Sequence, residues 1–211
     1  MKILASLGFA TLALSAHATL FTFNSGPIDL LDNSPASPSP VDFNVTGLDG
    51  NVTNVGIYFN GITHAFPEDL GAVLFSSTGH GTLLFDGPGN ADETNTAAWD
   101  WKFDESITNV KLSDTGSNPT GFYAAGQNKF SDTFTGAPTG PYGSSLLDYN
   151  GLTSAQALGH WLLYIQDFVP PDAGTIQNVQ LRITTTPVPE PATLAVLGLG
   201  IFGLMQTRKR R

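Results

Sequence analysis

The chain has 211 residues, room for one domain of ordinary size, with 23 Gly, 14 Pro and no Cys. The absence of Cys excludes disulfides and thiolate sites, so stability must come from the core or from metal ions. Between Thr19 and Thr186 there are 17 acidic residues against four basic ones. That excess serves solubility, argues against nucleic acid and anionic lipid as partners, and suits cations or neutral ligands.

The N-terminus has the pattern of a secretory signal peptide over residues 1–18. Lys2 precedes an apolar run from Ile3 to Leu14, and the small residues Ala16 and Ala18 fit the groove of signal peptidase. We therefore expect a signal helix in the precursor and cleavage after Ala18. A retained N-terminal anchor is the alternative, but the apolar run is short for a membrane span.

Short segments of period-two alternation, separated by turn residues, follow along the chain. Residues 19–40 are predicted to hold an edge strand at 20–23 and then a Pro- and Ser-rich linker. A single helical turn is predicted at 154–158. No long amphipathic helix is present, so the pattern predicts an all-β, jelly-roll-like β-sandwich over residues 41–184. The strands of this sandwich are expected at residues 41–45, 55–59, 69–75, 82–85, 97–103, 107–112, 146–149, 161–165 and 179–183.

The last two of these runs flank a turn at Pro170, Pro171 and Gly174. The aromatic and branched run 161–165 predicts a buried strand, and alternation over 179–183 predicts a strand with one wet face. A strand pair of this kind is not stable alone in water and needs a second apolar sheet.

Trp99, Trp101 and Phe103 alternate along one predicted strand and therefore share one face. Exposed, they would form a platform on which sugar rings stack. Large aromatic side chains in a row pack inward more often, so we predict that they belong to the core.

Carboxylates at loop ends suggest calcium, which prefers several oxygen ligands from flexible loops. Turn-forming acids on a solvated rim are the plainer interpretation. The candidate calcium ligands are Glu68, Asp69, Asp86, Asp92, Asp167 and Asp172.

No catalytic residue is predicted. His64, His80 and His160 lie beside no nucleophile motif, and a structural hydrogen bond is expected for His64. A glycosidase with paired carboxylates at Glu68 and Asp69 is an alternative, although abundant acids do not by themselves give the required separation.

Several short motifs in this order resemble the P domain of proprotein convertases. They are His64-Ala-Phe-Pro-Glu-Asp-Leu70, Ser77-Thr-Gly-His-Gly81, Leu147-Asp-Tyr-Asn-Gly151, Gly159-His-Trp161, Asp167, Gly174 and Leu181-Arg-Ile183. The resemblance implies a jelly-roll-like sandwich of about eight strands that usually accompanies a subtilisin-like serine protease domain. Ser77 departs from the Pro often found there, and this chain carries no serine-protease motif.

The C-terminus combines a Pro-rich spacer at 185–191, an apolar segment at 192–206 and a basic tail at 207–211. As a helix the apolar run spans roughly 21 Å, less than the roughly 30 Å bilayer core. We nevertheless expect a transmembrane helix, with snorkelling cations and a thinned bilayer covering the difference. The basic residues are expected to stay cytoplasmic, and they are Arg208, Lys209, Arg210 and Arg211.

This order resembles the PEP-CTERM sorting signal of Gram-negative envelope proteins, with the motif Val188, Pro189, Glu190 and Pro191. The resemblance implies that an exosortase-type membrane protease cuts near the motif and passes the domain to the cell surface. A simple tail anchor with an incidental spacer is the alternative.

Together these features predict an exported, surface-sorted, non-catalytic interaction module, with the exopolysaccharide matrix as its setting. A carbohydrate-active enzyme and an accessory module of a subtilisin-like endopeptidase remain alternatives. The expected partners are signal peptidase, an exosortase-type protease, exopolysaccharide and, for the precursor, the membrane.

Overall fold

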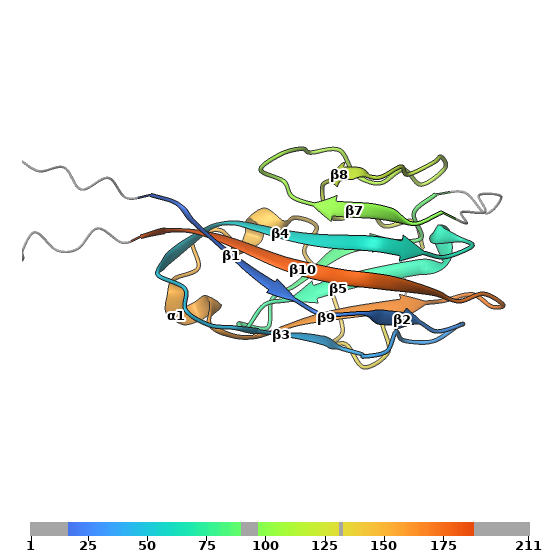
Figure 1. The fold of residues 1–211 in the computed structure, drawn as a ribbon, viewed down its shortest axis with the longest axis horizontal. Coiled ribbons are helices and arrows are strands. Elements are labelled where there is room, and N and C mark those ends of the chain that lie inside the picture. Colours follow the sequence, from blue (N-terminus) through green and yellow to red (C-terminus); the bar gives the residue numbers. More distant parts are fainter. Residues whose placement is uncertain (1–16, 90–96, 131–132, 188–211) are drawn as a thin grey trace, which may run out of the picture.

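Two β-sheets packed face to face hold nearly all the regular structure of residues 17–89, 97–130 and 133–187, which the computed structural model describes (Figure 1). The predicted all-β sandwich is thereby confirmed. The six-stranded sheet has the order β1-β10-β4-β7-β8, with β2 also paired to β10. Its strands are β1 (Thr19–Asn24), β2 (Ile28–Leu30), β4 (Gly50–Thr63), β7 (Trp99–Phe103), β8 (Gly121–Tyr123) and β10 (Gly174–Pro187).

The four-stranded sheet is antiparallel throughout, with the order β3-β9-β5-β6. Strands β5 and β6 are continuously buried because both of their faces are covered. One face meets the other sheet, and the outer face carries a small second core that includes Val73, Phe75 and Leu83. The strands of the four-stranded sheet are β3 (Val41–Val45), β5 (Leu70–Phe75), β6 (Gly81–Asp86) and β9 (Gly159–Asp167).

The main core lies between the sheets and is built from the inward-facing residues of alternating strands. Trp99, Trp101 and Phe103 are 4%, 0% and 0% exposed, so the prediction that they belong to the core is confirmed. Burial of both Trp rings excludes them as a glycan platform. The Phe85 ring packs against Trp101 and Phe59 at 5.3 and 5.7 Å between centroids.

Three short helical segments complete the described structure: η1 (Pro67–Asp69), η2 (Leu146–Tyr149) and α1 (Ser154–Ala157). The single helical turn predicted at 154–158 is confirmed, and Thr153 and Gln156 close it with a capping box. The strand predicted at 146–149 is wrong, because that segment forms η2. The Ser145 side chain accepts a hydrogen bond from the Leu147 amide there and starts a turn instead.

Three further expectations need correction. The segment predicted as a linker after Asn24 contains β2, which pairs with β10. The strand predicted at 107–112 is wrong, because Asp104 closes a turn by accepting hydrogen bonds from the Ser106 amide and hydroxyl. Strands β9 and β10 do not pair with each other. They lie in different sheets, and the chain crosses between the sheets at Pro170 and Pro171.

The start of β1 and the end of β10 lie at the same end of the sandwich, since Thr19 is opposite Thr185 (Figure 1). Within the described residues no helix is long and apolar enough to cross a membrane. The predicted signal peptide, including Ala16, and the predicted segment at 192–206 lie outside the described residues. Ala18 lies immediately before β1.

Candidate functional site

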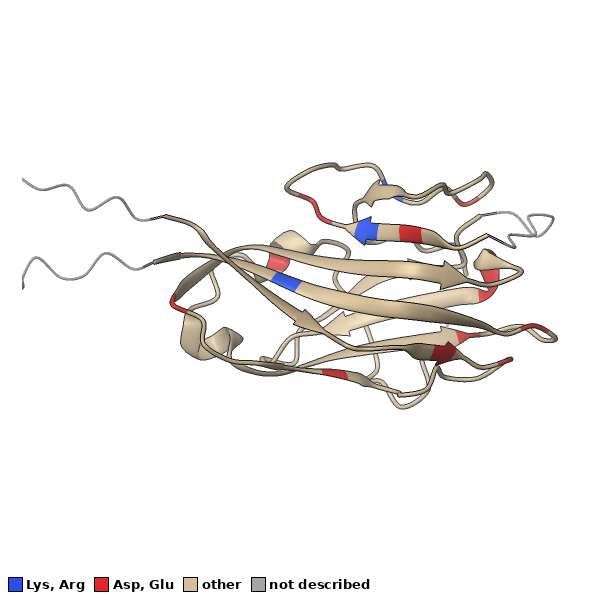
Figure 2. Ribbon diagram, viewed as in Figure 1, with Lys and Arg blue, Asp and Glu red and all other residues tan. Residues whose placement is uncertain are grey.

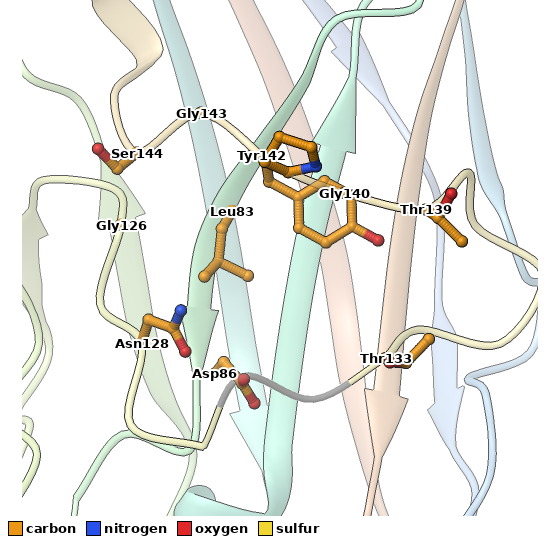
Figure 3. Close-up of a pocket in the computed structure, with 11 residues that line it drawn as sticks. Leu83, Asp86, Gly126, Asn128, Thr133, Thr139, Gly140, Tyr142, Gly143 and Ser144 are labelled. Atoms are coloured by element: carbon orange, nitrogen blue, oxygen red, sulfur yellow. The ribbon is translucent and has the colours of Figure 1, made fainter.

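A groove of about 450 Å³ lies on the outer side of β6, where Gly126 and Gly143 are hydrogen-bonded to this strand. Its volume is in the usual range of small-molecule sites. Figure 3 shows that the side chains come from β6 and from the loop that covers it. The lining residues are Leu83, Asp86, Gly126, Asn128, Thr133, Thr139, Gly140, Pro141, Tyr142, Gly143 and Ser144.

Backbone hydrogen bonds attach the covering loop to β6 and so fix the walls of the groove. The Leu83 amide donates to the Gly143 carbonyl at 2.9 Å, and the Gly143 amide donates to the Gly81 carbonyl at 2.8 Å. Gly126 donates to the Leu83 carbonyl at 2.9 Å and has φ +87°, a conformation that favours glycine. The two loop segments on this side of the groove are therefore both held to one strand.

The aromatic wall is Tyr142, whose ring is held in one orientation. It packs edge-on against Phe75 and Phe134, at 5.8 and 6.2 Å between centroids. The Tyr142 hydroxyl donates to the Pro138 carbonyl at 2.9 Å, and burial raises the pKa of Tyr142. The ring is thus a pre-positioned flat surface beside the groove.

The polar groups lie along the floor and rim (Figure 3). Asp86 ends β6 at 1% exposure, and its backbone amide donates to the Gln127 side chain at 2.9 Å. Asn128, Thr139 and Ser144 are exposed at the rim. One carboxylate, one amide and several hydroxyls therefore line the same groove as one aromatic ring and the apolar Leu83.

Only some of the predicted calcium ligands come together. Asp86 lines the groove, and Asp92 lies outside the described residues. Glu68 pairs with Lys129 at 3.1 Å. The other three, Asp69, Asp167 and Asp172, gather at the end of the sandwich away from the start of β1. Acidic positions are frequent at that end (Figure 2).

His64 joins these carboxylates, a grouping that the sequence analysis did not predict. Its Nε2 lies 3.1 Å from Asp167 Oδ2, and its Nδ1 lies 3.0 Å from the Phe66 carbonyl oxygen and 3.1 Å from Asp172 Oδ2. The structural hydrogen bond expected for His64 is thus present. Burial lowers the pKa of His64, but the hydrogen bond to Asp167 and the charges of Asp172 and Asp167 outweigh it and raise that pKa.

Asp69 is 8% exposed and lies among like charges. Burial, together with the charges of Asp172, Asp167 and Glu68, raises the pKa of Asp69 to about 7. His80 and His160 do not belong to this arrangement and lie in exposed ion pairs. His80 is 3.5 Å from Asp148, and His160 is 2.9 Å from Asp42.

The comparisons with known proteins concern mainly the C-terminus. Residues 187–211 match the PEP-CTERM protein-sorting motif, as the resemblance at Pro189-Glu190-Pro191 implied. The motif implies an exported protein that is processed at the membrane by an exosortase-type enzyme. No curated protein matches the chain in sequence.

Two solved structures overlap with the chain in three dimensions. They are the serine protease of Aeromonas sobria, at 12% identity, and the complex of that protease with the chaperone ORF2, at 10% identity. They cover 83% and 85% of this chain, which spans 28% of the length of each of theirs. The TM-score is 0.41 in both cases, so this likeness carries no argument about function.

Proposed function

We propose that this chain is a non-catalytic glycan-binding module of P-domain type, held at the surface or in the exopolysaccharide matrix of a Gram-negative cell. The observation that carries the proposal is the groove beside β6, which is lined by the fixed ring of Tyr142 and by Asp86 and Asn128. Sugars present an apolar ring face and several hydroxyls to a protein. An aromatic ring can stack on that face. A carboxylate can accept hydrogen bonds from the hydroxyls, and a side-chain amide can both donate to them and accept from them.

The charge of the domain narrows the ligand class. Acidic residues exceed basic ones by 13 between Thr19 and Thr186, and Asp86 lies in the groove itself. An anionic polysaccharide would be repelled, so the ligand is a neutral glycan.

The groove favours binding over hydrolysis. Glycosidases place two carboxyl groups on opposite sides of the scissile bond, about 5–9.5 Å apart. Among the described residues that line the groove, Asp86 alone carries a carboxyl group. The alternative pair Glu68 and Asp69 does not line the groove, and Glu68 is held by Lys129 at 3.1 Å.

The places of the resembling motifs in the fold support the P-domain part of the proposal. Asp69 ends η1 and Leu70 begins β5, the segment from Ser77 to His80 leads into β6 at Gly81, and Gly159-His-Trp161 opens β9. These three motifs lie at turns and strand ends of the four-stranded sheet, whereas Leu181-Arg-Ile183 lies within β10 of the other sheet. The family also suggests a role as an accessory module of a protease, which the following experiment distinguishes from glycan binding.

The test is direct binding of the exported protein, recovered from the cell envelope, to an array of neutral and acidic oligosaccharides. We expect binding to a neutral glycan without turnover. Replacing the flat ring by Tyr142→Leu should weaken binding about tenfold, because one stacking contact contributes on the order of 1 kcal/mol. Asn128→Ala should weaken it to a similar extent.

Asn51→Ala is the matched control, since it removes an exposed amide from β4 outside the groove. Thermal unfolding of each variant separates a binding defect from a folding defect. Release of free sugar would instead identify a carbohydrate-active enzyme, and co-purification with a protease in the absence of glycan binding would favour the accessory module.

A further inference from the structure

Three buried titratable residues and the partly buried Asp172 meet at the end of the sandwich opposite the start of β1 and the end of β10. His64 follows β4, Asp69 ends η1, Asp167 ends β9 and Asp172 lies in the turn that leads into β10. The packing is close: a Cβ added at Gly174 would lie 1.9 Å from the Thr63 carbonyl oxygen. The turns that leave and enter both sheets are thereby brought against one another (Figure 1).

We propose that His64, Asp167 and Asp172 bind one divalent transition-metal ion of the Zn²⁺ or Mn²⁺ type, with Asp69 as a neighbouring carboxylate. One ligand atom from each of the three residues lies within 4.8 Å of the others. Ligand atoms that share one ion at about 2.0–2.2 Å lie no more than about 4.4 Å apart. A contraction of a few tenths of an ångström, about the size of a side-chain adjustment, therefore forms the site.

The local charge favours a cation. His64 is the one basic partner of these carboxylates in the ion pairs of the described residues, while the nearby Lys129 pairs with Glu68. Three carboxyl groups thus face one imidazole in a buried place. A divalent ion would offset the charge that a single imidazolium cannot.

A second observation is independent of the charge. Asp172 Oδ1 is fully buried and has no hydrogen-bond partner among the described residues. Its other oxygen, Oδ2, is already held by the Phe66 amide at 3.2 Å. Buried polar atoms are satisfied in nearly all proteins, so a buried acceptor without a donor points to a ligand at this place.

Hydrogen bonds from backbone amides hold the two carboxylate ligands in fixed orientations. Asp167 Oδ1 accepts from the Val169 amide at 2.9 Å, which leaves Oδ2 directed at His64. Metal sites are commonly supported by such outer hydrogen bonds. The anchoring donors here are backbone amides, so they do not depend on the rotamer of another side chain.

The imidazole determines the class of metal. Calcium and magnesium prefer oxygen ligands, whereas a neutral imidazole nitrogen suits zinc and similar transition-metal ions, and the carboxylates also suit manganese. The sequence predicted calcium from carboxylates alone. The inclusion of His64 instead points to a mixed nitrogen and oxygen site, which would tie the β4–β5 turn to the β9–β10 turn in a chain that has no disulfide.

The experiment uses the full chain purified in detergent and treated with a chelator, then titrated separately with Zn²⁺, Mn²⁺, Ca²⁺ and Mg²⁺. We expect one Zn²⁺ or Mn²⁺ per chain by elemental analysis and a higher thermal midpoint with that ion. Co²⁺ should give visible absorption bands that differ in energy and intensity from those of the hydrated ion, as expected for a site with a nitrogen ligand. Asp172→Asn, which keeps the shape of the side chain, should weaken binding by at least about tenfold.

Asp42→Asn is the matched control. It removes the carboxylate of the exposed His160–Asp42 pair, whose atoms lie 2.9 Å apart, and should leave binding unchanged. A midpoint that rises with Ca²⁺ alone would overturn the role of His64, and no bound ion in any titration would overturn the site. Unchanged binding in Asp172→Asn would do the same. The Co²⁺ spectrum of the unaltered chain requires no variant, so a variant that does not fold cannot obscure the result.

Discussion

Tyr58 forms a buried hydrogen bond to a charged acceptor between neighbouring strands. Its hydroxyl donates to Asp104 Oδ2 at 2.9 Å, and the Arg182 guanidinium lies 4.7 Å from the centre of its ring. Tyr58→Phe should lower the free energy of unfolding at pH 7 by about 1.5–3 kcal/mol, because the Asp104 carboxylate loses a donor. Urea denaturation measures this. Tyr123→Phe is the control, since the Tyr123 hydroxyl donates to the neutral Pro119 carbonyl and should cost only about 0.5–1.5 kcal/mol.

The contribution of Tyr58 should also depend on pH. Burial, the hydrogen bond to Asp104 and the charge of Asp104 raise the pKa of Tyr58 from 10.0 to about 12. The folded state therefore keeps the proton that the unfolded state loses. The stabilisation is complete below pH 10 and is lost as the pH rises through 12, so the difference from Tyr58→Phe should shrink over that interval. An unchanged difference at pH 11 would contradict this assignment.

At the scale of single residues, the sequence predicts which residue types form a site better than it predicts which residues come together. Asp69, Asp167 and Asp172 could be chosen as loop-end carboxylates, but their sharing of one site depends on the register that places Leu70 opposite Asp167. His64 was missed because its partners lie more than 100 residues away along the chain. The spacing of His64 before Asp69 could have signalled a shared turn, but it gives no information about β9.

At the scale of elements, period-two alternation located most of the strands. Val179, Leu181 and Ile183 are all fully buried, as their alternation predicted. The failures occurred where side chains redirect the backbone or where a strand is only three residues long, as in β8. The pattern also could not show that β9 and β10 belong to different sheets. A buried strand looks the same in sequence whichever sheet it joins.

The groove depends on a close approach of two loop segments at Gly126. A Cβ at this position would lie 2.5 Å from the Ser144 carbonyl oxygen, and φ is +87°. Gly126→Ala should therefore move the two segments apart, lower the thermal midpoint and weaken glycan binding. Gly26→Ala is the matched control, because φ is +80° there but no atom lies within 4 Å. Equal losses of stability in the two variants would mean that backbone strain alone matters, without the contact to Ser144.

At the scale of the whole molecule, the sandwich separates its attachment end from its acidic end. Strand β10 has 14 residues and runs from the cluster around Asp172 to Pro187, where the sorting motif begins. At about 3.3 Å per residue these two places lie roughly 40–45 Å apart. A protein held through its C-terminus would thus carry His64 and its neighbouring carboxylates at the end farthest from its attachment.

Processing at the sorting motif should remove the apolar segment and the basic tail together. We expect the protein from the native envelope to begin at Thr19 and to lack Arg208–Arg211. Glu190→Gln should leave the uncleaved chain in the membrane fraction, because the Pro-flanked, extended motif presents this carboxylate to the protease. Mass analysis of the membrane and surface fractions measures both ends. Asp32→Asn, an exposed carboxylate in the described part of the chain, is the control and should be processed normally. An intact Arg211 in the surface fraction would show that the tail is an anchor, and the domain would then remain tethered by the end from which β1 and β10 emerge.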